Sequence, residues 1–76
     1  MNYEKFKRKV EGDFEKHRDG WKNPVSFIHL PTNEVAVITY EDDEYSCLLH
    51  DSDGNPILSY INTDNLYEMY VELMGE

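Results

Sequence analysis

The carboxylates are the side chains of this chain with the most capacity for chemistry, and they are unevenly placed. Residues 23–76 contain eleven Asp and Glu residues and no Lys or Arg, whereas all seven basic residues lie in residues 1–22. With five further carboxylates in residues 1–22, the segment charges are +2 and −11, and the chain carries −9. Phosphates repel carboxylates, so this balance disfavours direct binding to nucleic acid or an anionic membrane and favours a basic protein partner.

One group of carboxylates recurs every four residues near the C-terminus, at Asp64, Glu68, Glu72 and Glu76. Positions four apart share one face of a helix, with about 6 Å of rise per step. Like charges at this spacing weaken a helix by about 0.2–0.5 kcal/mol per pair, and no Lys relieves them here. The spacing predicts either a carboxylate row that docks on a basic groove, in place of a phosphate backbone, or a solvated helix face.

A second group, Glu41-Asp42-Asp43-Glu44, lies between Tyr40 and Tyr45. Tyrosines beside charged residues are common at protein interfaces, so this segment is a candidate contact loop for a basic partner. A polar hairpin tip that prevents edge-to-edge aggregation is the alternative, and a divalent-cation site at the tip is a further one.

Other site chemistry finds no support in the sequence. The stretch Asp51–Asn55 fails the EF-hand pattern, because Gly54 at position 6 would place Leu49 and Tyr60 at the ligand positions 1 and 12. Cys47 and His50 are three apart on an expected strand, so they point to opposite faces and cannot share a zinc ion. Glycine-rich phosphate loops and nucleophile motifs are absent. We therefore predict no enzyme activity, no catalytic residue, no cofactor and no metal ligands beyond the tip alternative.

Two amphipathic helices are expected at the ends of the chain. Residues 3–19 place Tyr3, Phe6, Val10 and Phe14 on one face, with Asn2 as N-cap, Gly20 as the stop and Trp21 folded back onto the core. The second helix follows cap residues Asn62-Thr63-Asp64 and ends at Gly75. Its expected core stripe is Leu66, Met69, Tyr70, Leu73 and Met74.

Four strands are expected between the helices, at residues 25–30, 34–40, 45–50 and 57–61, separated by short turns. The order α-β-β-β-β-α predicts an α+β fold, a four-stranded antiparallel meander flanked by an N-terminal and a C-terminal helix. A partly open SH3-like barrel with terminal helices is the alternative.

Strand pairing follows from the turns. A loop at residues 41–44 pairs Tyr40 with Tyr45, Ile38 with Cys47 and Ala36 with Leu49. A two-residue turn at Asp53-Gly54 pairs Leu49 with Leu58 and Cys47 with Tyr60. One sheet face is then apolar or amphipathic throughout: Ala36, Ile38, Tyr40, Tyr45, Cys47, Leu49, Leu58 and Tyr60. The other face is mixed and needs a crossing helix or a partner to cover it: Val35, Val37, Thr39, Ser46, Leu48, His50, Ile57, Ser59 and Ile61.

These patterns predict one domain over residues 1–76. A single cysteine excludes an internal disulfide, and no apolar run approaches the roughly 20 residues that span a bilayer, so a cytoplasmic location is expected. The function expected is a small acidic protein that inhibits or modulates a basic, nucleic-acid-handling protein, in the manner of DNA mimics from phages and mobile elements. The alternative is a protein-protein interaction module or homodimer that uses the mixed sheet face, with acidity serving only solubility.

Overall fold

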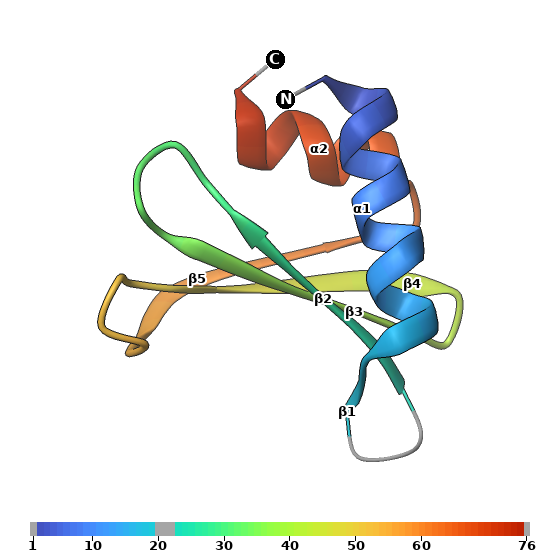
Figure 1. The fold of residues 1–76 in the computed structure, drawn as a ribbon, viewed down its shortest axis with the longest axis horizontal. Coiled ribbons are helices and arrows are strands. Elements are labelled where there is room, and N and C mark those ends of the chain that lie inside the picture. The colour runs from blue at the N-terminus through green and yellow to red at the C-terminus, as the bar shows by residue number, and fades with distance from the viewer. Residues whose placement is uncertain (1, 20–22, 76) are drawn as a thin grey trace.

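A helix lies at each end of the chain, and an antiparallel sheet lies between them (Figure 1). The structure, a computed structural model, describes residues 2–19 and 23–75. Its sheet is open, with the strand order β1-β2-β3-β4-β5. The predicted α+β meander with terminal helices is confirmed, with a two-residue strand β1 added at one edge. The elements are α1 Tyr3–Lys16, β1 Arg18–Asp19, β2 Asn23–His29, β3 Val35–Glu41, β4 Glu44–His50, β5 Pro56–Thr63 and α2 Leu66–Met74.

Helix α1 begins as predicted and ends earlier. The Asn2 side chain accepts a hydrogen bond from the Lys5 amide at 2.9 Å, which is the expected N-cap. The helix ends at Lys16 because His17 is already extended, and Arg18 and Asp19 pair with β2 as strand β1. The predicted end at residue 19 is therefore three residues too late. The predicted stop at Gly20 and core position of Trp21 lie outside the described residues.

The pairing of β3 with β4 matches the prediction residue by residue. Tyr40 lies opposite Tyr45, Ile38 opposite Cys47, and Ala36 opposite Leu49. The connecting turn is tighter than expected, since β3 extends to Glu41 and β4 starts at Glu44. Both central residues, Asp42 and Asp43, have positive φ (54° and 64°), as a two-residue type I′ hairpin requires.

The predicted pairing of β4 with β5 is wrong by one residue. Cys47 lies opposite Ile61 and Leu48 opposite Tyr60, so Ile61 turns toward the helices and Tyr60 turns away. The register shifts between Leu48 and His50, where two steps along β4 match four steps along β5 from Tyr60 to Pro56.

The turn before β5 contributes to the shift. Asp51 accepts hydrogen bonds from the Asp53 and Asn55 amides, both at 2.9 Å, and the Asn55 carbonyl accepts from the Asp51 amide. The hydrogen bonds that the Asp51 carboxylate accepts lower its pKa, and the bond from the Asn55 amide has the largest effect. They close a loop over residues 51–55, longer than the two-residue turn expected at Asp53-Gly54. Gly54 supplies its positive φ of 88°.

Both helices pack on the same face of the sheet. One core contains Phe6 and Val10 of α1, Leu66, Met69 and Tyr70 of α2, and the sheet residues that face the helices. This confirms the predicted helix stripes. The buried members of the core are Phe6, Val10, Ile28, Leu30, Ala36, Ile38, Cys47, Leu66, Met69 and Tyr70.

Helix α2 starts two residues after the expected cap region. Its N-cap is Asn65, whose side chain accepts from the Tyr67 and Glu68 amides. Gly75 ends the helix in the left-handed conformation (φ 74°), as predicted. Within the described residues, no helix is long and apolar enough to cross a membrane.

Candidate protein-binding surface

The sheet face opposite the helices is left uncovered by them. Residues directly opposite one another on neighbouring strands share a face, and the register aligns one such set across four strands. Phe27 lies opposite Val37, Val37 opposite Leu48, and Leu48 opposite Tyr60. We call these four residues the apolar row. At about 4.8 Å per strand, the row spans about 14 Å across the sheet.

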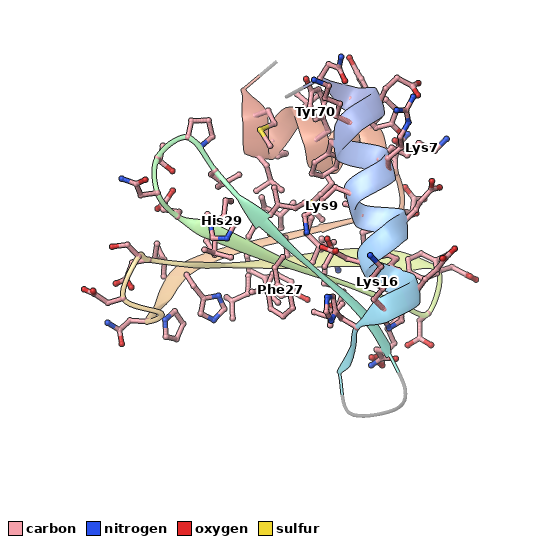
Figure 2. All side chains as sticks on the ribbon, in the orientation of Figure 1. Lys7, Lys9, Lys16, Phe27, His29 and Tyr70 are labelled. Atoms are coloured by element: carbon pink, nitrogen blue, oxygen red, sulfur yellow. The ribbon has the colours of Figure 1, made fainter. Side chains whose placement is uncertain are left out.

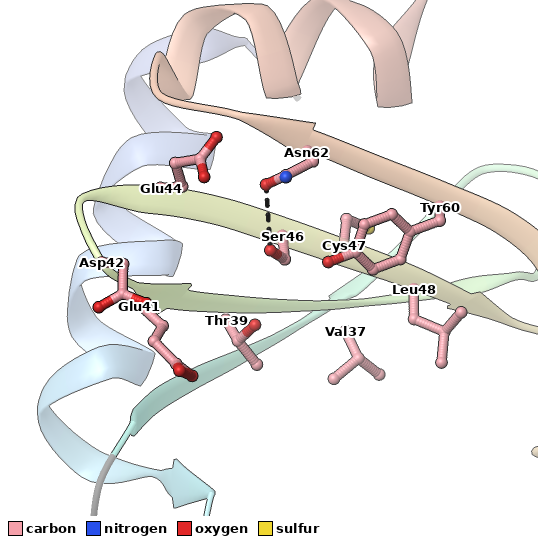
Figure 3. A pocket seen from close by; sticks show the side chains of 10 residues that line it. All are labelled: Val37, Thr39, Glu41, Asp42, Glu44, Ser46, Cys47, Leu48, Tyr60 and Asn62. Carbon is pink, nitrogen blue, oxygen red and sulfur yellow. Dashed lines mark hydrogen bonds between the residues drawn. The ribbon is translucent and has the colours of Figure 1, made fainter.

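Three members of the apolar row are large hydrophobic side chains with substantial exposure. Phe27 is 42% exposed, Leu48 37% and Tyr60 65%. Beside Leu48 and Tyr60 the face is hollowed by about 450 Å³ (Figure 3). The row, with Thr39, Ser46 and Asn62 next to it, therefore forms a shallow apolar-to-polar surface. Asn62 is held there by a 3.2 Å hydrogen bond from the Ser46 hydroxyl.

The acidic tip, Glu41-Asp42-Asp43-Glu44, borders the same hollow. Glu41 and Glu44 lie opposite each other, on the face shared with Thr39 and Ser46, and Asp42 also lines the hollow. All four tip residues are exposed. The Glu41 carboxylate is held by a 2.8 Å hydrogen bond from the side-chain amide of Asn23 on β2. The tip carboxylates therefore stand at one end of the uncovered face.

The two tyrosines beside the tip lie on the opposite face of the sheet. Tyr40 and Tyr45 pack against each other with ring centroids 4.7 Å apart, and Tyr45 stacks on Phe14 of α1 at 6.3 Å. Burial raises the pKa of Tyr45, and the nearby Tyr40 raises it further by a smaller amount. These rings position the hairpin against α1, and they are separated by the sheet from Glu41 and Glu44.

The predicted row of four carboxylates along one helix is wrong at Asp64. Helix α2 begins at Leu66, so Asp64 precedes it, and Glu76 lies outside the described residues. Glu68 and Glu72 remain one turn apart on α2. They line a separate hollow of about 440 Å³ between α2 and β5. The two carboxylate groups expected from the sequence thus border different hollows, the tip on the uncovered face and the α2 pair beside β5.

Basic side chains are placed elsewhere. Figure 2 shows Lys7, Lys9 and Lys16 along α1, and strands β2 to β5 and helix α2 carry no Lys or Arg. Within residues 2–19 and 23–75, the ion pair found joins Lys9 to Asp13 on α1, at 2.6 Å. Among the side chains that the structure describes, no ion pair therefore neutralises the tip or the two α2 carboxylates.

Two residues of this surface escaped the sequence reasoning. Phe27 was unassigned because nothing in the sequence set the register of the first long strand. The two-residue turn predicted at Asp53-Gly54 places Tyr60 on the covered face, whereas the longer loop over residues 51–55 places it on the uncovered one. The run Asp51-x-Asp53-Gly54-Asn55 was the available signal, since Asp side chains readily bond amides two residues on and build longer turns.

The other reactive groups add no further site, although Cys47 is among the residues that line the hollow (Figure 3). Cys47 is 1% exposed within the core, and burial raises its pKa to about 12. Among the residues that the structure describes, no three His, Cys, Asp or Glu side chains are grouped so as to hold a metal ion. Comparisons with protein-family models, with curated proteins and with solved structures found no match to this chain.

Proposed function

We propose that this chain is a small acidic protein without catalytic activity that binds a basic protein and modulates or inhibits it. The observation that carries the proposal is the uncovered sheet face, on which the apolar row leads to the acidic tip. Exposed Phe, Leu and Tyr side chains supply contact area for affinity. Carboxylates at the margin select a partner of opposite charge and accelerate encounter.

The partner class that fits this charge layout is a protein whose basic surface ordinarily meets nucleic acid. Such a surface is built to complement closely spaced negative charges, which the chain presents at the tip with no ion pair among the described side chains. Docking there would compete with the nucleic acid itself. This is the action of an inhibitor of the DNA-mimic type.

A second candidate is an interaction module that pairs with another copy through the apolar row, with acidity serving solubility. The exposure of Phe27, Leu48 and Tyr60 favours it. Against it stands charge, because two-fold pairing would bring together two chains of net charge −9. A basic partner removes that repulsion, so it remains the preferred candidate.

The test begins with capture of a binding protein from cell lysate and continues with the purified pair. Affinity is measured by titration calorimetry at about 0.05 M and 0.5 M salt, where the Debye length falls from roughly 14 Å to 4 Å. The double variant Glu41→Lys/Glu44→Lys replaces two negative charges of the tip with two positive charges. Glu11→Lys/Glu15→Lys, on exposed positions of α1, makes the same charge change elsewhere and is the matched control.

We expect high salt and tip reversal each to weaken binding by about tenfold or more, and the α1 control to matter much less. Leu48→Ser should also weaken binding, by removing an anchor from the apolar row. Affinity that is indifferent to salt and to tip reversal would contradict the proposal. Sedimentation of the free chain tests the second candidate, for which a dimer must form and must dissociate in the Leu48→Ser variant.

A further inference from the structure

The two edges of the sheet differ in whether their outward backbone groups have hydrogen-bond partners. At the β2 edge, α1 and the residue after it supply hydrogen-bond acceptors where β1 stops. The His17 carbonyl accepts from the Val25 amide at 3.0 Å, and the Asp13 carboxylate accepts from the Phe27 amide at 3.2 Å. At the opposite edge, β5 is the last strand of the sheet. Unpaired strand edges are templates for another strand, so this asymmetry singles out β5.

The hairpin geometry determines which backbone groups of β4 face β5. The two residues that flank a two-residue turn, here Glu41 and Glu44, exchange hydrogen bonds with each other. Because successive residues of a strand direct their N–H and C=O groups to opposite sides, Glu44, Ser46 and Leu48 point these groups at β3. Tyr45 and Cys47 consequently point theirs at β5.

The same alternation continues onto β5. Ile61 and Thr63 lie opposite Cys47 and Tyr45, so they complete those hydrogen-bonded pairs. The backbone groups of Tyr60 and Asn62 must then point away from the sheet. In the described part of the chain, no further backbone hydrogen bond involves either residue. They offer two donors and two acceptors at the free edge.

A groove accompanies this edge. The hollow between β5 and α2, which we call the β5–α2 groove, has a volume of about 440 Å³. Tyr60 and Tyr67 on its sides are 65% and 51% exposed, and Ile61 and Val71 are half-buried. The groove is lined by Tyr60, Ile61, Asn62, Thr63, Tyr67, Glu68, Val71 and Glu72.

The charge in the groove is negative. The Glu68 carboxylate accepts a 2.7 Å hydrogen bond from the Thr63 hydroxyl, which holds it beside the strand. Glu72 lies one turn further, about 6 Å along the helix. Alternate residues of an extended chain are separated by about 6.6–6.8 Å, so two basic side chains on one face of a strand match this spacing.

We propose that the β5–α2 groove binds an extended segment of a protein partner, with Lys or Arg at alternate positions, as an additional strand on β5. Backbone hydrogen bonds to Tyr60 and Asn62 would supply strand pairing, and Glu68 and Glu72 would select basic side chains. This inference rests on the proposed function, since it assumes a basic partner, and it adds where and in what conformation part of that partner binds.

The test uses a defined probe, an acetylated and amidated octapeptide of alternating Lys and Val. Two further peptides carry backbone N-methyl groups, one on every Lys and the other on every Val. In an added strand, all residues of one kind direct their N–H groups at β5, so methylation of that set removes the pairing bonds. We expect one methylated peptide to bind at least about tenfold more weakly than the other, by calorimetry.

Protein variants and amide exchange complete the experiment. Glu68→Lys/Glu72→Lys should weaken the unmethylated peptide by about tenfold, whereas Glu11→Lys/Glu15→Lys, with the same four-residue spacing on α1, should change binding much less. Peptide addition should slow hydrogen exchange at the Tyr60 and Asn62 amides. The methylated peptides and the exchange measurement use the unchanged protein. They therefore still test the proposal if the Glu68→Lys/Glu72→Lys variant unfolds α2.

Equal binding of the two methylated peptides, or no binding of any peptide at millimolar concentration, would overturn strand addition. Neither result bears on the proposed function, which is tested through tip reversal and salt with the whole partner. Conversely, peptide binding with the expected asymmetry alongside a salt-insensitive whole partner would keep the groove and reject the proposed use of the tip.

Discussion

The buried carboxylate of Asp13 should be one of the largest single side-chain contributors to the stability of this fold. It accepts hydrogen bonds from Lys9 Nζ at 2.6 Å, Ser26 Oγ at 2.9 Å and the Phe27 amide at 3.2 Å. Asp13 is 7% exposed and Ser26 fully buried. The carboxylate thereby joins α1 to the edge of β2, and Asp13→Ala removes that connection.

The cost of Asp13→Ala can be estimated from its partners. Leaving the buried Ser26 hydroxyl unsatisfied costs about 1–3 kcal/mol, and the Phe27 amide loses a bond worth about 1 kcal/mol. The Lys9 pair, half exposed at its lysine, adds about 0.5 kcal/mol. The higher helix propensity of Ala than of Asp offsets about 0.5 kcal/mol of this loss. We expect the free energy of unfolding to fall by about 3 kcal/mol, and Tm to fall by roughly 12–24 °C.

The assay is urea and thermal unfolding followed by circular dichroism. Glu15→Ala, exposed on the same helix, is the control and should change stability by less than about 0.5 kcal/mol. Adding Ser26→Ala to Asp13→Ala should recover about 1 kcal/mol, because the stranded hydroxyl is removed. If Asp13→Ala costs no more than the control, the hydrogen bonds do not stabilise the fold and the reasoning fails.

The pH dependence offers an independent check on the same group. Burial raises the pKa of Asp13, but the hydrogen bonds from Lys9, Ser26 and the Phe27 amide outweigh it and hold the pKa below its ordinary value of 3.8. A depressed pKa means that the stabilisation is present above about pH 3.8 and is lost as the pH falls through the folded-state pKa. The stability gap between the wild type and Asp13→Asn should therefore narrow in acid, and a constant gap down to pH 2 would contradict this.

Three further predictions concern the core, the α2 cap and the tip. Because burial raises its pKa to about 12, the Cys47 thiol should resist an aromatic disulfide reagent at pH 8 until urea unfolds the chain; rapid reaction of the folded protein would contradict its burial. Asn65→Ala should lower the free energy of unfolding by about 1 kcal/mol, since the Tyr67 and Glu68 amides lose their acceptor, and an unchanged urea midpoint would argue against the cap. Asp43→Gly should raise the free energy of unfolding by about 0.5–1 kcal/mol, because glycine adopts the positive φ of 64° at this position without strain. A loss of stability would count against the type I′ turn.

Local patterns in the sequence were enough to locate most elements. The 3.6-residue stripe of α2, the N-cap at Asn2 and the left-handed stop at Gly75 depend on residues within one or two turns, so they were predictable. The same holds for the β3–β4 hairpin, where a polar tip between two runs rich in apolar residues sets the register. The segregation of eleven carboxylates from the basic residues is likewise a property of the sequence alone.

The register of β5 needed the tertiary structure, because the Asp51 hydrogen bonds and the shift near His50 change the pairing by one residue. A one-residue slip moves every side chain to the other face, which is why Tyr60 joined the uncovered face and Ile61 the core. Only the packing of both helices on one face decided that the apolar row stays open. The sequence by itself determined how much negative charge this chain carries and in which segments. The tertiary structure decided that the tip borders the uncovered face and that the two α2 carboxylates line a groove beside β5, because strand pairing sets which faces and edges remain free.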